Sequence, residues 1–181
     1  MGKLAIRDLY DIWLECILDM PISWQNTLDF AAPKEFCERH STTNACKQAN
    51  LSTEIINLSE AKLAPFHMEK NLNPTNSRNI LMLRNNKPWI FAASWIEAQD
   101  SSEILEAYNN LGDNSLGSIL FNGAWSRGEF KFAEVLKYLC RASYFTAKST
   151  GEQVYLIEMF FKDTDDAEYC YEQTKLKMAH E

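Results

Sequence analysis

The chain has 181 residues, 46% of them hydrophobic and 12% aromatic, and a formal net charge of -7. This length and composition predict one globular domain with a substantial core. The acidic excess argues against a nucleic-acid partner, because phosphate binding needs a basic surface. The longest apolar run, 88–96, is far shorter than the roughly 20 residues that cross a bilayer. We therefore expect no membrane span.

The five cysteines are an odd number and form no Cys-x-x-Cys pair. This argues against a disulfide framework and for free thiols in a reducing compartment. The N-terminus lacks a signal-peptide pattern, since charged and apolar residues alternate there. We expect a cytoplasmic protein, with a monomer as the simplest assembly. Cys37, His40 and Cys46 supply three soft ligands where structural zinc needs four, so we expect no metal.

The N-terminal part of the chain predicts a helix followed by mostly irregular structure. Residues 8–20 place apolar side chains at helical spacing with acidic side chains between them, and Pro21 follows. Residues 23–50 predict loops with short helical pieces, and residues 51–58 predict a strand. Residues 58–77 contain prolines and several asparagines and predict a long loop, able to lie over a site.

Residues 78–83 and 88–96 predict a β-hairpin. Asn85 and Asn86 lie between the two runs, and asparagine tolerates the positive φ that tight hairpin turns require. Alternation along the second strand predicts one shared face for four side chains: Trp89, Phe91, Ala93 and Trp95.

Two helices are predicted after the hairpin. The first begins with Asp100 as its cap and runs to about Asn110, and Gly112 ends it in a left-handed conformation. Ser115 is expected to cap a second, short helix that reaches Phe121.

Three further strands are predicted, over residues 126–135, 140–147 and 153–161. Together with the earlier strands they indicate an α+β fold, in which a single antiparallel sheet of about six strands has helices packed against it. We expect residues 1–161 to form this single domain. Residues 162–181 form a charged C-terminal tail, either a surface helix over 167–178 or partly disordered.

Glu158 is a lone acid on an apolar strand face. By strand alternation it shares that face with Val154, Leu156 and Phe160. If the face is buried, desolvation favours the protonated acid unless a cation or a donor compensates, which is how general acids are prepared. An exposed face or a structural ion pair explains the pattern equally well.

Two other features suggest a site for a small anion. Arg78 shares a face with Ile80 and Met82, and its guanidinium offers the fork that grips a carboxylate, although a solvated arginine at a strand end is the more ordinary explanation. Gly112 and Gly117 each follow a leucine and bring backbone N–H groups close to a neighbour. An ordinary turn between two helices explains the two glycines equally well.

Short motifs follow one another in a fixed order over residues 41–161. They are Ser41-Thr42-Thr43, Arg78-Asn79-Ile80-Leu81-Met82, Lys87-Pro88-Trp89, Leu111-Gly112, Leu116-Gly117-Ser118-Ile119-Leu120-Phe121, Arg127, Arg141-Ala142-Ser143 and Glu158-Met159-Phe160. In this order and spacing the chain resembles the bacterial chorismate lyases, which make 4-hydroxybenzoate for ubiquinone. The resemblance implies an antiparallel sheet with helices against it, a ligand enclosed beneath flaps, and a reaction without metal or cofactor.

The resemblance also implies that chorismate is the substrate and that 4-hydroxybenzoate and pyruvate are the products. Carried over by position, Arg78 clamps the ring carboxylate, and the backbones of Leu116 and Thr42 align the ring. Glu158 contacts the 4-hydroxyl end and either assists proton transfer or only orients the ring during an intramolecular transfer. Three basic residues are candidates for the second carboxylate: Arg127, Arg141 and Lys87.

Two other functions compete with this one. The ligand-sensing domains of one family of bacterial transcription regulators share the chorismate lyase fold and bind small acids without catalysis. Such regulators carry an N-terminal helix-turn-helix, for which the acidic residues 1–40 leave no room. The second competing function is that of a structural protein, which docks to a partner through an amphipathic helix over 167–178.

Overall fold

The computed structural model describes residues 23–27, 52–57, 77–135 and 138–161. Within these ranges it contains seven strands and two helices. In chain order they are β1 (Thr53–Asn57), β2 (Ser77–Arg84), β3 (Lys87–Glu97), α4 (Glu103–Asn109), α5 (Gly117–Leu120), β4 (Trp125–Arg127), β5 (Lys131–Val135), β6 (Tyr138–Ala147) and β7 (Gln153–Phe160).

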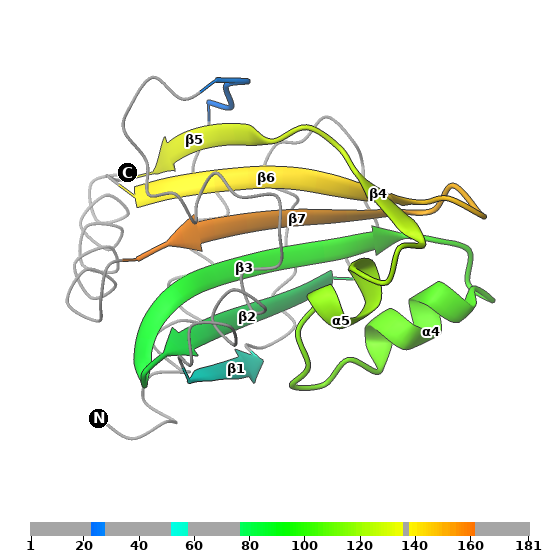
Figure 1. Ribbon diagram of the computed structural model, residues 1–181, viewed down its shortest axis with the longest axis horizontal. Coiled ribbons are helices and arrows are strands. Elements are labelled where there is room, and N and C mark those ends of the chain that lie inside the picture. Colours follow the sequence, from blue (N-terminus) through cyan, green and yellow to red (C-terminus); the bar gives the residue numbers. More distant parts are fainter. Residues whose placement is uncertain (1–22, 28–51, 58–76, 136–137, 162–181) are drawn as a thin grey trace, which may run out of the picture.

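All strand pairs are antiparallel, and the strands form one sheet (Figure 1). The order is β1-β2-β3-β7-β6-β4, and β5 also pairs with β6. Because β7 occupies one edge of β6, both β4 and β5 lie along its other edge. The prediction of a single antiparallel sheet of about six strands is therefore confirmed, with seven strands among the described residues.

The chain around Gly128 divides a segment that we predicted to be one strand over residues 126–135. Arg127 pairs with Phe145 and Lys131 pairs with Ala142, so three residues on one side face two on the other. Gly128 lies directly against Tyr144, whose ring would be 2.4 Å from a Cβ at that position. The prediction of one strand was wrong, because this bulge interrupts the ladder between β4 and β5.

The β2–β3 hairpin is confirmed, with Asn85 at φ 51° and Asn86 at φ 62°. One detail of the prediction was wrong. The register shifts after Met82, which leaves Trp89 as an extra residue on β3. Trp89 therefore packs with Met82 and meets Phe160 edge-on at 6.5 Å, on the face opposite to the one we expected.

The helices begin differently from the prediction. Ser102 caps α4, since its Oγ accepts hydrogen bonds from the N–H groups of Ile104 and Leu105, and Asp100 is not the cap. α5 has no side-chain cap at all, so Ser115 does not have the expected role. Gly112 does adopt the predicted positive φ, at 51°.

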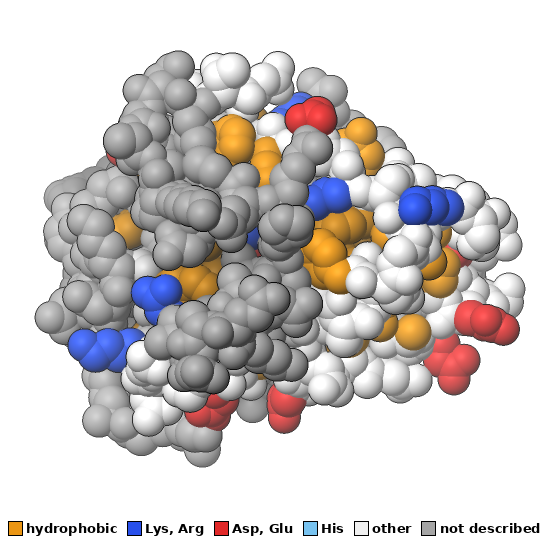
Figure 2. Space-filling view, in the orientation of Figure 1, with side chains coloured by type: hydrophobic (Ala, Val, Ile, Leu, Met, Phe, Trp, Pro, Cys, Tyr) orange, Lys and Arg blue, Asp and Glu red, His pale blue; other side chains and the backbone are white. Residues whose placement is uncertain are grey.

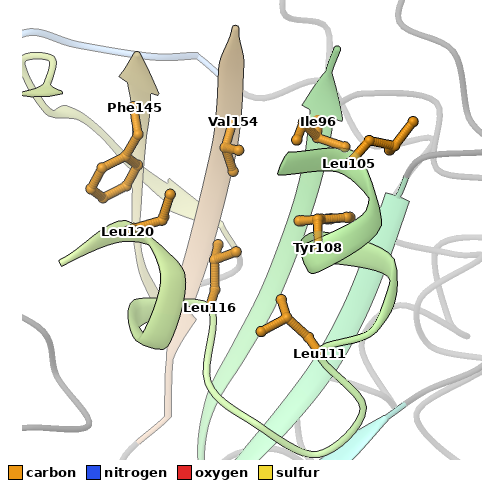
Figure 3. Close-up of a cluster of buried hydrophobic side chains, with 8 residues drawn as sticks. All are labelled: Ile96, Leu105, Tyr108, Leu111, Leu116, Leu120, Phe145 and Val154. Carbon is orange, nitrogen blue, oxygen red and sulfur yellow. The ribbon is translucent and has the colours of Figure 1, made fainter. Parts of the chain in front are cut away.

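Helices α4 and α5 cover one face of the sheet, which we call the helix-bearing face (Figure 3). A cluster of buried side chains joins the helices to β3, β6 and β7: Ile96, Leu105, Tyr108, Leu111, Leu116, Leu120, Phe145 and Val154. Side chains on the opposite face, such as Leu81, Phe91 and Met159, are also buried. Burial of each large apolar side chain stabilises the fold by about 1.5–3 kcal/mol.

Several predictions lie outside the described residues. They are the helix over 8–20, most of the loops over 23–50 and 58–77, the tail over 162–181, and the residues Thr42, Cys37, His40 and Cys46. Within the described residues, no helix has the length and apolar character needed to cross a membrane.

Asn79 carries a buried amide on the face of the sheet opposite the helices. Its side chain is 2% exposed, and neither Oδ1 nor Nδ2 has a hydrogen-bond partner among the described residues. An unsatisfied buried amide costs about 1–3 kcal/mol, and valine suits a strand. We expect Asn79→Val to raise the free energy of unfolding by about 1 kcal/mol in urea titrations. Asn79→Ala is the control, with a smaller gain because it leaves a cavity; a loss of stability in the valine variant would contradict this account.

Candidate functional site

A pocket opens on the helix-bearing face between α5 and the sheet, with a cavity volume of about 50 Å³. On this side of the molecule, hydrophobic and basic side chains are exposed next to one another (Figure 2). The pocket is lined by Ile80, Met82, Ala92, Ser115, Leu116, Gly117, Leu120, Phe121, Arg127, Arg141, Phe145, Leu156 and Glu158.

The register of the strands brings together the side chains that form the sheet side of this pocket. Ile80 on β2 lies opposite Ala92 on β3, which lies opposite Glu158 on β7, which lies opposite Arg141 on β6. Side chains directly opposite one another in an antiparallel sheet share a face. The lone acid predicted from alternation therefore is buried, at 6% exposure, and has a guanidinium beside it.

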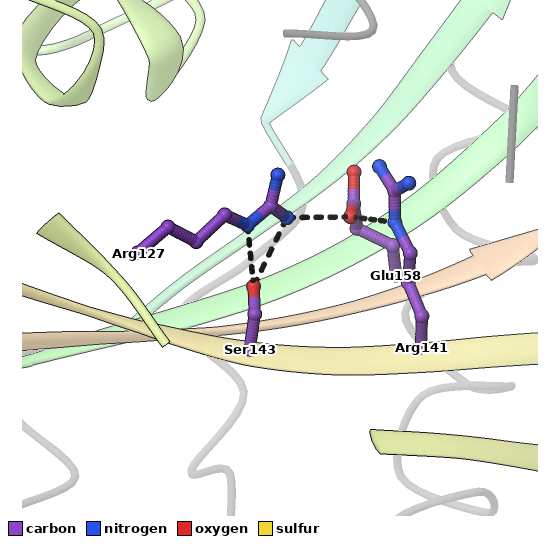
Figure 4. Close-up of polar contacts among 4 residues, drawn as sticks. All are labelled: Arg127, Arg141, Ser143 and Glu158. Carbon is purple, nitrogen blue, oxygen red and sulfur yellow. Dashed lines mark hydrogen bonds and ion pairs between the residues drawn. The ribbon is translucent and has the colours of Figure 1, made fainter. Parts of the chain in front are cut away.

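Two arginines converge on the Glu158 carboxylate (Figure 4). Arg141 donates from Nε to Oε2 of Glu158 at 2.5 Å, and Arg127 places Nη2 at 3.8 Å from the same oxygen. Arg127 also donates from Nε and Nη2 to Oγ of Ser143, at 3.2 and 3.0 Å. The ion pairs compensate the buried negative charge, and the carboxylate keeps acceptor capacity for a hydroxyl of a ligand.

Aromatic rings hold both guanidinium groups in place. Cζ of Arg127 lies 4.3 Å from the ring centroid of Phe130 and 4.8 Å from that of Phe145. Cζ of Arg141 lies 5.1 Å from the Phe130 centroid and 5.0 Å from that of Phe160. Cation–π contacts of this kind contribute about 0.5–2 kcal/mol each and restrict the arginine side chains. The polar end of the pocket is therefore ordered before any ligand arrives.

Arg78 does not line this pocket. Its Nη2 donates to the carbonyl oxygens of Gly112 at 2.7 Å and Asn114 at 2.9 Å, and its Nε donates to Oδ1 of Asn57 at 3.3 Å. Burial lowers the pKa of Arg78, and the nearby Tyr108 and Asp113 act in the opposite direction. The structure therefore shows Arg78 bound to the loop between α4 and α5, and its contact with a ring carboxylate stays a prediction.

The other predicted site residues are distributed as follows. Leu116 lines the pocket from the helix side, and its N–H has no acceptor among the described residues. Arg127 and Arg141, two of the three candidates for a second carboxylate, line it as well. Lys87 is exposed at the β2–β3 turn, outside the lining, and Thr42 lies outside the described residues. No cluster of three metal-ligating side chains occurs within the described ranges.

Ser143 and the rings of Phe130 and Phe145 were missed by the sequence reasoning. Alternation along β6 places residues 141, 143 and 145 on one face, and this signal was available for Ser143 and Phe145. Phe130 lies in the bulge between β4 and β5, where no periodicity applies.

No protein-family model matches this chain, and no curated protein matches it in sequence. The resemblance to chorismate lyases therefore rests on the motifs alone and stays a prediction.

Arg141 and Glu158 should be energetically coupled. Within the described part of the chain, Arg141→Met leaves the buried carboxylate with only the more distant Arg127 beside it, so we expect the free energy of unfolding to fall by about 3 kcal/mol. The double variant Arg141→Met/Glu158→Gln should lose less than the two single variants together, by about 1–3 kcal/mol. Urea unfolding of all four proteins measures this, with the exposed Lys131→Met on β5 as a near-neutral control. Strict additivity would show that the pair is not coupled.

Proposed function

We propose that this chain is a chorismate pyruvate-lyase, which eliminates pyruvate from chorismate to give 4-hydroxybenzoate for ubiquinone biosynthesis and needs no cofactor. One observation carries the proposal: Glu158 lies buried beside Arg127 and Arg141 at one end of a pocket whose walls are otherwise mostly apolar. The chemistry of this lining suits a ring that bears a hydroxyl and carboxylates. The motif series over residues 41–161 supports the same substrate.

In the proposed reaction, the protein does not need to form a covalent bond with the substrate. The bond between the ring and the enolpyruvyl oxygen breaks, the ring loses one hydrogen, and the methylene carbon of the side chain gains one, which gives pyruvate. The ring becomes aromatic, so the driving force is already in the substrate. The protein has to position the ring, exclude water and manage one proton.

The residues would divide this work. Glu158 hydrogen-bonds the 4-hydroxyl group and either assists the proton transfer or orients the ring during an intramolecular transfer. Apolar side chains such as Ile80 and Leu156 flank the ring, and the Leu116 backbone aligns it. Arg127 meets the enolpyruvyl carboxylate. Arg78 is proposed to contact the ring carboxylate through Nη1, which makes no hydrogen bond to any described residue.

One observation favours the alternative of a small-acid sensor without catalysis. The short ion pair between Arg141 and Glu158 ties up the carboxylate, and this suits recognition of a hydroxyl better than transfer of a proton. The same pocket would then bind an aromatic acid and release it unchanged.

Incubation of the purified chain with chorismate separates these functions. We expect 4-hydroxybenzoate and pyruvate to appear in equal amounts, faster than in a sample without protein. Chromatography measures the first product and a coupled lactate dehydrogenase assay the second. Binding of 4-hydroxybenzoate without turnover would establish the sensor, and neither binding nor turnover would refute both functions.

Glu158→Gln tests the proton role. If Glu158 transfers a proton, the variant should lose about 10²- to 10⁴-fold in kcat. The exposed Glu134→Gln on β5 is the matched control and should keep the activity of the parent. Undiminished turnover in Glu158→Gln would remove Glu158 from any proton transfer and leave it an orienting role.

A further inference from the structure

We propose that Asn57 is a positioning residue of the pocket, which together with Arg78 fixes the loop over residues 110–115 that leads into the Leu116 wall. The role in ligand binding rests on the proposed function, whereas the fixing of the loop does not. Asn57 ends β1 and lies at the edge of the same row across the sheet that contains Ile80, Ala92 and Glu158.

The Asn57 side chain makes three hydrogen bonds that cross between segments distant in sequence. Its Nδ2 donates to the carbonyl oxygen of Gly112 and to Oδ1 of Asp113, both at 2.8 Å. Its Oδ1 accepts from Nε of Arg78 at 3.3 Å. An amide can donate twice and accept at the same time, which neither a carboxylate nor a hydroxyl can do here.

Arg78 closes the same network from β2. Its Nη2 reaches the carbonyl oxygens of Gly112 and Asn114, so Gly112 accepts from both Asn57 and Arg78. The loop is also tied to itself, because Nδ2 of Asn114 donates to the carbonyl oxygen of Leu111 at 3.0 Å. The carbonyl groups of Gly112 and Asn114 are thereby bound to the sheet.

The helix side of the pocket needs this external support. α5 has four residues and no side-chain cap, and so short a helix has little stability of its own. Its placement depends on the packing of Leu116 and Leu120 and on the loop that precedes it. Because Ser115, Leu116 and Gly117 line the pocket directly after this loop, a shift of the loop displaces the wall that faces the ligand.

Three variants test the inference. Asn57→Ala removes all three bonds, and Asn57→Asp keeps the acceptor for Arg78 but loses the donor and faces Asp113 with a like charge. Ser102→Ala is the control, because it removes the cap of α4 and destabilises the protein without touching the loop. We measure hydrogen–deuterium exchange over residues 111–121, the Kd for 4-hydroxybenzoate and, for chorismate, kcat/KM per folded molecule.

Both Asn57 variants should exchange faster over 111–121 and lose about 10- to 100-fold in affinity and in kcat/KM, since a misplaced binding wall has effects of this size. Ser102→Ala should lower the Tm but leave all three readouts unchanged. A purely structural Asn57 would lower the Tm while folded molecules keep the parent Kd, and that result overturns the inference. If the parent neither binds nor converts its ligand, the proposed function fails, and unchanged exchange in the Asn57 variants would separately refute the positioning of the loop.

Discussion

The ion pair between Arg141 and Glu158 is the constraint on which both the sheet and the pocket depend. The two residues lie directly opposite each other on β6 and β7, so their contact and the strand register require one another. A slip by one residue would turn Glu158 to the opposite face, among apolar side chains. Because an unpaired buried carboxylate is strongly destabilising, the charge pair selects the register that also builds the pocket.

The aromatic side chains extend this constraint to Arg127. Phe130 contacts both guanidinium groups, and it lies in the bulge between β4 and β5. The bulge therefore does more than interrupt the pairing of β4 and β5 with β6. It also brings the Phe130 ring into contact with two arginines that come from different strands. Ser143 adds two hydrogen bonds to Arg127, so the guanidinium has a fixed orientation beside Glu158. A ligand that enters this end meets groups that need little reorganisation.

How far the sequence predicts these features depends on the range of the interactions involved. Alternation is local, and it correctly places Glu158 on the same strand face as Leu156, although it left open whether that face is buried. The turn between β2 and β3 follows from another local property, the positive φ that asparagine tolerates. Bulges are set by contacts between distant segments, and for this reason Trp89 and the division of residues 126–135 were mispredicted. The hydrogen-bond partners of Arg78 lie up to 36 residues away in the sequence, so no local sequence pattern predicts them.

The two sides of the pocket are held by different means, and this difference bears on what each side can do. The sheet side rests on backbone ladders and a buried ion pair, so a change there affects both stability and chemistry. The helix side rests on apolar packing and on a few side-chain hydrogen bonds from β1 and β2 to the loop before α5. Changes in that loop can therefore alter which ring is accepted while Glu158 and its arginines keep their arrangement.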